Sequence, residues 1–260
     1  MWWDRSELLE LYLSPGAIGR AATAVGAARW TQTSDLADSI RHLGSWLDDA
    51  AAPEVRRIRV WLSGSFAWPY LVPVASGARN RREVHALATA MARDATGIEG
   101  EVRLWLDRWH VDEPTLAVAI PADVWRMLHD MADARNAARR TMPRKQRLPA
   151  IKIASVRPWW NLPFDSLLTQ SRGDANRVGW SLSDGDGVVH GVVDRGSVVE
   201  IGFDRPGLHD PTGSLLRRRL QVNWGAAAAG RHLHFERDAA SPEMSALPIG
   251  AWRDMSGNLA

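Results

Sequence analysis

The chain has 260 residues, of which 45% are hydrophobic and 24% are charged, and its formal net charge at pH 7 is +2. This composition is typical of a globular protein with a sizeable core, and the near balance of charge gives no strong overall field that would attract nucleic acids or membranes. The chain contains no cysteine, which excludes disulfides, zinc–thiolate sites and cysteine nucleophiles. No segment approaches the roughly 20 apolar residues of a transmembrane helix, and no signal peptide is recognisable, so we expect a cytoplasmic protein.

Three strands and a helix are predicted at the start of the chain. Alternating apolar residues indicate strands at 8–13, 17–23 and 28–33. Ser34 or Asp35 is a suitable N-cap for the helix that follows, whose apolar residues recur at helical spacing as far as Leu47. Two further strands are predicted at 57–62 and 70–74.

A block of helices and strands is predicted next. Its elements are a helix at 79–94, strands at 101–107 and 115–120, a helix from Pro121 to about residue 140, a strand at 150–156 and a short helix from Pro158. Gly97 is a suitable residue to end the first of these helices, and Pro121 is well placed to begin the second.

A β-hairpin with an Asp-Gly-Asp-Gly turn is the strongest local signal in the chain. Residues 178–196 predict two short strands that meet at residues 184–187, because such turns favour hairpins. A strand at 198–203, a helix at 211–224 and a strand at 232–235 are predicted to follow. The last residues, 241–260, carry few core signals and are predicted to form an irregular tail.

This hairpin resembles the second phosphate-binding hairpin of the actin-like superfamily. Gly185, Asp186 and Gly187 match its Gly-Asp-Gly turn, and His190 stands at the histidine position of actin. Three strands followed by a helix also occur in both halves of the chain, which is the topological mark of actin-like folds. The resemblance implies a mixed α/β fold of the actin-like, RNase H-like type.

Three segments resemble actin-like proteins of bacterial assembly platforms, namely the PilM-like protein of type IV pili and the GspL-like cytoplasmic domain of type II secretion. These segments are RIRVWLSGSFAWPYLVPV at 57–74, the block at 83–131 and IKIASVRPWWNLPFDSLL at 151–168. The resemblance implies a first lobe at 1–170 that includes an inserted subdomain at about 76–140. A reduced second lobe would occupy 177–240.

The two hairpins expected to bind nucleotide are degenerate in this chain. In LYLSPGAIGR, Ser14 stands where the family has an aspartate, and Gly16 is the only closely placed glycine. In the second hairpin Ser183 replaces the leading aspartate, although Asp184 is adjacent and could substitute. Loss of both carboxylates removes most of the charge that would hold a divalent ion, so we expect no catalytic residues and no cofactor.

A nucleotide-binding protein remains the alternative. Such a protein, an actin-like ATPase or a sugar-kinase-like enzyme, would bind ATP with magnesium through the residues of the two turns. These residues are Ser14, Gly16, Gly185, Asp186 and Gly187.

One histidine pair could bind a metal. His232 and His234 would lie on one face of a strand together with Glu236, but no further ligand can be placed beside them from the sequence. A solvent-facing strand is the simpler interpretation, and we expect no metal site.

Two other polar groups could imitate a catalytic site. The members of the first, which lies between two predicted strands, are Asp107, His110, Asp112 and Glu113. A polar turn explains this group more simply than acid–base chemistry does. The second group, Ser63 and Ser65, lacks the G-x-S-x-G pattern of a hydrolase nucleophile.

Basic clusters and paired tryptophans are the remaining candidates for interaction. Arginine-rich segments occur at 139–147 and 217–219, and the first of them could contact anionic headgroups or be a solvated loop. Trp159-Trp160 is equally compatible with a core position and an interface, whereas Trp2-Trp3 favours an interface slightly.

These observations lead to an expected function. We expect a catalytically inactive adaptor at the cytoplasmic face of the inner membrane, serving a type IV pilus-like or type II secretion-like assembly complex. Its partner would be an inner-membrane component, because in the PilM-like family a cleft between subdomains binds a short cytoplasmic peptide. Nucleic acid is not expected to bind, and membrane contact would be peripheral at most. An unrelated α+β binding module is the second alternative.

Overall fold

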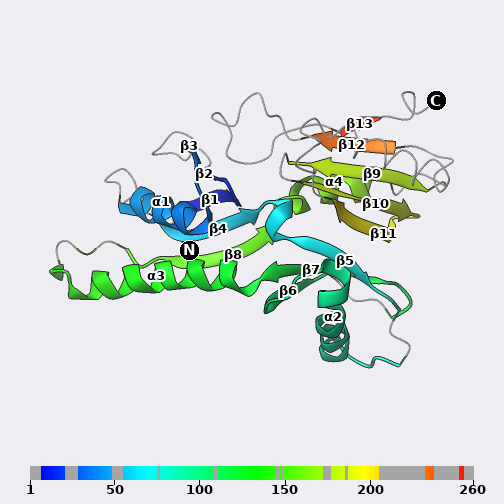
Figure 1. Ribbon diagram of the computed structural model, residues 1–260, viewed down its shortest axis with the longest axis horizontal. Helices are drawn as coiled ribbons and strands as arrows, with labels where there is room; N and C mark the ends of the chain where they lie inside the picture. Colours follow the sequence, from blue (N-terminus) through cyan, green and yellow to red (C-terminus); the bar gives the residue numbers. More distant parts are fainter. Residues whose placement is uncertain are drawn as a thin grey trace, which may run out of the picture. The chain divides into compact units, whose positions relative to one another are not determined.

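The computed structural model describes residues 7–20, 29–48, 55–74, 77–107, 111–144, 147, 149–171, 177–184, 187–204, 232–236 and 252–254. The chain forms two compact units (Figure 1). Unit 1 contains residues 1–66, 121–159 and 238–249, and unit 2 contains residues 67–120, 160–237 and 250–260. Both units contain helices and strands, which confirms the mixed α/β fold class.

A five-stranded sheet is the centre of unit 1. Its strands lie in the order β3-β2-β1-β4-β8. They are β1 (Glu7–Ser14), β2 (Ala17–Arg20), β3 (Arg29–Gln32), β4 (Val55–Leu62) and β8 (Lys152–Pro158). The first three strands form an antiparallel meander, whereas β4 runs parallel to β1 and β8 runs parallel to β4.

Helix α1 (Leu36–Asp48) begins at the predicted cap. The Asp35 carboxylate accepts the Asp38 N–H at 2.8 Å, and the Asp38 carboxylate accepts the Ser34 N–H at 3.1 Å. This exchange satisfies amides that have no partner within the first turn of a helix. The apolar face of α1 is buried, with Leu43 only 1% exposed.

Helix α3 (Ala122–Thr141) packs against α1 and β8 (Figure 1). It buries the apolar residues Val124, Leu128 and Ala132. The Asn136 amide holds the chain just before β8, because it donates to the Ile151 carbonyl at 2.8 Å and accepts the Ile151 N–H at 2.9 Å.

A smaller three-stranded sheet and one helix form the first part of unit 2. The strands β5 (Trp68–Val72), β7 (Thr115–Pro121) and β6 (Val102–Leu106) lie in the order β5-β7-β6, and α2 (Arg81–Thr96) packs against β5 and β6. Gly97 ends α2 in the left-handed conformation at φ 70°, as predicted from the sequence. Burial raises the pKa of Tyr70 to about 12, and its hydroxyl donates to the Ala88 carbonyl at 2.8 Å.

The second five-stranded sheet completes unit 2. Its strands lie in the order β11-β10-β9-β12-β13. They are β9 (Val178–Ser183), β10 (Val188–Asp194), β11 (Ser197–Asp204), β12 (His232–Glu236) and β13 (Trp252–Asp254). Helix α4 (Asn161–Ser171) contributes Phe164, whose ring lies 5.2 Å from that of the fully buried Trp180 in β9.

The two five-stranded sheets share one topology. Each has the order third, second, first, fourth and fifth strand, and in each the fourth strand runs parallel to the first. They differ at the fifth strand, since β8 is parallel to its neighbour and β13 is antiparallel. This is the duplication that the repeated order of strands in the sequence indicated.

The predicted lobes at 1–170 and 177–240 stay a prediction, because the two compact units divide the chain by contacts alone. The predicted insertion at 76–140 includes α3, which belongs to unit 1 because it packs against α1 and β8. The predicted tail at 241–260 contains β13, which pairs with β12. The predicted helix at 211–224 lies outside the described residues. Within the part of the chain that the structure describes, no helix has the length and apolar character needed to cross a membrane.

Candidate functional site: the two hairpins

The first hairpin has a turn of only two residues. Ser14 at the end of β1 pairs with Ala17 at the start of β2, which leaves Pro15 and Gly16 between the strands. Pro15 has no N–H, so the turn itself can offer a phosphate only the amide of Gly16. Ser14 is 3% exposed, and its hydroxyl donates to the Ala17 carbonyl at 3.4 Å. The turn of this hairpin therefore offers a phosphate one backbone amide and no carboxylate.

The second hairpin uses the carboxylate of Asp184 to close its own turn. Asp184, which is 8% exposed, accepts the Gly187 N–H at 3.1 Å, and its own N–H donates to the Gly187 carbonyl at 3.4 Å. Ser183 pairs with Val188 at the ends of the two strands. Gly185 and Asp186 lie outside the described residues. Asp184 thus stabilises the turn through these two hydrogen bonds. From the sequence it was a possible replacement for the missing aspartate.

An aromatic ring explains why position 187 is glycine. A Cβ atom at Gly187 would lie 2.4 Å from a ring carbon of Phe203 on β11. The Phe203 ring stacks in turn on Trp68 of β5, with centroids 6.3 Å apart and planes 17° apart. The space beside Gly187 is therefore filled by protein. Sequence reasoning missed this contact, because nothing local marks Trp68 and Phe203 as neighbours.

His190, at the histidine position of actin, pairs within its own sheet. Its Nε2 lies 3.1 Å from Oδ2 of Asp204, and its side chain is 15% exposed. The ring covers Gly202, where a Cβ atom would lie 2.7 Å from the imidazole. Burial lowers the pKa of His190 below its ordinary value of 6.5, and the negative charges of Asp204 and Glu200 oppose this shift in part.

A pH dependence of stability follows from this burial. The unfolded chain takes up a proton at His190 near pH 6.5, whereas the folded protein resists protonation until a lower pH. The free energy of unfolding should therefore fall as the pH decreases from 7.5 to 5.5, and His190→Gln should reduce this fall. Denaturant titrations at both pH values check it, with His85→Gln on the exposed side of α2 as the control. If the free energy of unfolding falls by the same amount between pH 7.5 and 5.5 in wild type and in His190→Gln, the prediction is wrong.

The histidines of β12 do not form a metal cluster in the described residues. His234 Nδ1 lies 2.7 Å from the Ser181 hydroxyl of the neighbouring strand β9. The side chains of His232 and Glu236 are not described. Across the described segments, no group of three or more histidine, aspartate or glutamate side chains could hold a metal ion.

The other polar candidates are structural or exposed. The Asp107 N–H donates to the Leu116 carbonyl at 3.0 Å, Asp112 and Glu113 are exposed, and His110 lies outside the described residues. Ser63 is fully buried, and its N–H donates to the Leu13 carbonyl at 2.9 Å, which joins the ends of β4 and β1. Ser65 lies in a single 3-10 turn that follows β4.

The residues predicted as candidates for interaction either have a structural role or lie outside the described residues. Trp159 and Trp160 are both fully buried, which decides their interpretation in favour of the core. Trp2-Trp3 and the arginines at 217–219 lie outside the described residues. In the other basic segment, Arg147 donates to the carbonyls of Met142 at 3.0 Å and Arg140 at 3.4 Å, which caps the C-terminal end of α3.

Sequence comparison adds no relative: no family model and no curated protein matches this sequence. Solved structures do match. A Bacteroides thetaiotaomicron protein with an actin-like ATPase fold and unknown function aligns with a TM-score of 0.56 and 7% identity, over 86% of this chain and 77% of that one.

Two assembly proteins are also similar in structure. PilM, solved in the PilM–PilN type IV pilus biogenesis complex, aligns with a TM-score of 0.50 and 10% identity, over 85% of this chain and 73% of that one. The cytoplasmic domain of EpsL, an inner-membrane component of the type II secretion system of Vibrio cholerae, aligns with a TM-score of 0.42 and 14% identity, over 75% of this chain and 71% of that one. Together with the duplicated sheet topology, the similarity to the Bacteroides thetaiotaomicron protein shows that the chain has the actin-like ATPase fold.

Proposed function

We propose that the chain is a non-catalytic adaptor that acts by protein–protein recognition. The observation that carries this proposal is the state of the two hairpins. Each has a serine where an actin-like ATPase needs a carboxylate, and the described polar side chains Ser14 and Asp184 bond within their hairpins. A fold that keeps its duplicated sheets without these charges can still present surfaces to partners.

The proposed setting is an inner-membrane assembly complex of a type IV pilus-like or type II secretion-like machine, at its cytoplasmic face. PilM, one of the structurally similar proteins, was solved in complex with PilN. By analogy, the partner here would be a short cytoplasmic segment of an inner-membrane component. Membrane contact would be peripheral and indirect, through that partner.

Calorimetry with ATP and magnesium tests the non-catalytic half of the proposal. We expect no binding heat from the folded protein, because serine replaces the leading aspartate in both hairpins and the Asp184 carboxylate accepts the Gly187 N–H of its own turn. Asp186→Ala is the diagnostic variant, since Asp186 lies in the Gly-Asp-Gly turn. Binding that is clear in wild type and weakened in Asp186→Ala would restore the ATPase as the function.

Capture of partners tests the other half. The purified protein, immobilised, should retain an inner-membrane pilus or secretion component from detergent-solubilised membranes of its own source cells. A synthetic peptide with the sequence of the retained component's cytoplasmic segment should release that component from the immobilised protein. If every inner-membrane component of these machines is present in the extract and none is retained, the proposed setting is wrong.

A further inference from the structure

Strand β8 is the outer strand of the five-stranded sheet in unit 1. Among the described residues it pairs with β4 on one side, in parallel, and with no strand on the other side. An outer strand carries a row of backbone N–H and C=O groups along its free side, and such a row can pair with a strand from another chain. The free side of β8 is therefore a candidate for strand addition.

Three exposed cations lie on one face of the sheet at this edge. The register places Lys152 of β8 beside Arg57 of β4 and Arg157 of β8 beside Trp61 of β4. Arg57 and Trp61 point to the same face, because an even number of residues separates them along the strand. Lys152 and Arg157 share that face because the register of β8 shifts at Ala154. All three cations are exposed, and within the described part of the chain their side chains have no bonding partner.

The acidic group of this face is already paired. Among the described side chains that β1, β4 and β8 present on it, Glu10 is the acid, and its carboxylate accepts the Arg59 guanidinium at 2.8 Å. The Arg59 guanidinium also lies over the Trp61 ring, 5.8 Å from its centroid. Lys152, Arg157 and Arg57 are therefore an excess of positive charge beside the free edge.

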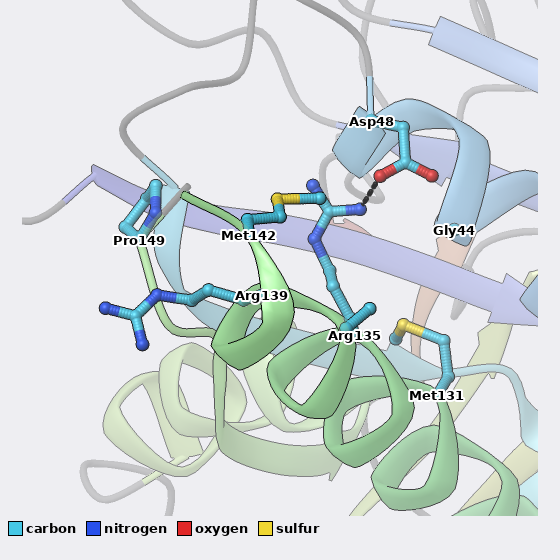
Figure 2. A pocket seen from close by; sticks show the side chains of 8 residues that line it. Gly44, Asp48, Met131, Arg135, Arg139, Met142 and Pro149 are labelled. Atoms are coloured by element: carbon cyan, nitrogen blue, oxygen red, sulfur yellow. Dashed lines mark hydrogen bonds and ion pairs between the residues drawn. The ribbon is translucent and has the colours of Figure 1, made fainter. Parts of the chain in front are cut away.

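Helix α3 holds β8 in place. Figure 1 shows β8 lying along α3, and the Asn136 amide bonds the backbone of Ile151 just before the strand. The C-terminal half of α3 is joined to α1, because the Arg135 guanidinium pairs with the Asp48 carboxylate and donates to the Leu47 carbonyl (Figure 2). Arg135 and Asp48 line a pocket of about 200 Å³ between the ends of the two helices. The edge is thus ordered before anything binds, which lowers the entropic cost of binding.

The charges of the edge oppose pairing with a second copy of this chain. Two β8 strands side by side, in either direction, would bring the cations of one copy opposite those of the other, and like charges directly opposite in a sheet are destabilising. The same charges favour a strand with carboxylates at the facing positions. The edge therefore selects its partner by charge.

We infer that the free edge of β8 is a docking site for an extended segment of a partner protein in which acidic residues alternate with apolar ones. The segment would add to the sheet as a further strand through backbone hydrogen bonds to β8. Its acidic residues would lie beside Lys152 and Arg157, because facing side chains of neighbouring strands are only about 5 Å apart. Its apolar residues would lie on the other face and cover Ile153, which is half-buried. The inference rests on the proposed function, because it names the chemistry of the segment that the adaptor would bind.

A designed peptide tests the inference directly. The probe is a fluorescein-labelled peptide in which glutamate alternates with valine over the length of β8, and its binding to the whole protein is measured by fluorescence anisotropy. We expect the affinity to fall about tenfold or more for Lys152→Glu/Arg157→Glu, because two attractive pairs across the strands become repulsive. A peptide with the same side chains and N-methylated backbone amides should bind at least about tenfold more weakly, because it cannot donate hydrogen bonds to β8.

The matched control is Arg82→Glu/Arg93→Glu, which makes the same change of charge at exposed positions of α2. It should leave the affinity for the peptide unchanged. Hydrogen exchange of the wild-type protein adds a structural readout, since bound peptide should slow exchange of the backbone amides of residues 152–158.

Three results would overturn the inference. The first is equal peptide binding by wild type and Lys152→Glu/Arg157→Glu. The second is equal binding of the N-methylated peptide, because charge alone would then explain the affinity. The third is binding of phosphatidylglycerol vesicles that depends on Lys152 and Arg157 while the peptide does not bind, because that result assigns the cations to the membrane.

The same variant separates this inference from the proposed function. Retention of a pilus or secretion component that is equal for wild type and Lys152→Glu/Arg157→Glu would overturn the docking site and support the adaptor. Peptide binding with the expected dependence on charge and backbone amides, but no retained component of either machine, would support the docking site and overturn the proposed setting.

Discussion

Gly191→Ala should destabilise unit 2 by about 3 kcal/mol or more, because the new methyl group has no space. A Cβ atom at Gly191 on β10 would lie 2.1 Å from the carbonyl oxygen of Glu200 on β11 and 3.0 Å from the ring of Trp180 on β9. The closest atom is backbone, so relief requires β10 and β11 to separate, which breaks their antiparallel hydrogen bonds. Guanidinium unfolding followed by far-ultraviolet circular dichroism measures the loss.

The control for this prediction is Gly100→Ala. No atom lies within 4 Å of a Cβ placed at Gly100, so the same substitution adds a methyl group to open space. It should change the free energy of unfolding by less than about 1 kcal/mol. If the two variants unfold at the same guanidinium concentration, the packing described for β10 is wrong.

Trp180→Ala should cost about 3–5 kcal/mol, the usual penalty for deleting a fully buried large aromatic side chain. Trp180 is completely buried in β9. Its ring lies between Phe164 of α4 and Gly191 of β10. Removal of the indole leaves a cavity that the sheet cannot close, because both neighbours belong to regular elements. The same unfolding experiment measures the effect.

Trp125→Ala is the corresponding control, because Trp125 lies half-buried on α3 and stacks on His129 of the same helix. Trp125→Ala should lower the free energy of unfolding clearly less than Trp180→Ala does. A reversed order of the two variants would show that Trp180 does not carry the core of the second sheet. Both large-effect variants disturb the sheet that holds the second hairpin, so neither is suitable for testing binding.

The sequence by itself determined the described helices and strands and their order, except β13, which lies in the segment predicted to be an irregular tail. Alternating apolar residues, the Asp35 cap and the Gly97 stop place strands and helices correctly, because these signals act within one turn or one strand. The Asp-Gly-Asp-Gly run predicts the β9–β10 hairpin for the same reason. The Gly-Asp-Gly hairpin, together with the repeated order of three strands and a helix, was sufficient to indicate the actin-like fold. Both serine replacements in the hairpins were also visible without a structure.

Only the tertiary structure decided what the candidate residues do. Gly187 faces the Phe203 ring, His190 pairs with Asp204, and Asp184 closes its turn. Likewise, only the packing of α3 against α1 and β8 brings Arg135 to Asp48 and creates the pocket between the helix ends. Apart from the Asp184 turn, these contacts depend on side chains from different elements. Their geometry follows from how whole strands and helices pack, which no local pattern of residues encodes.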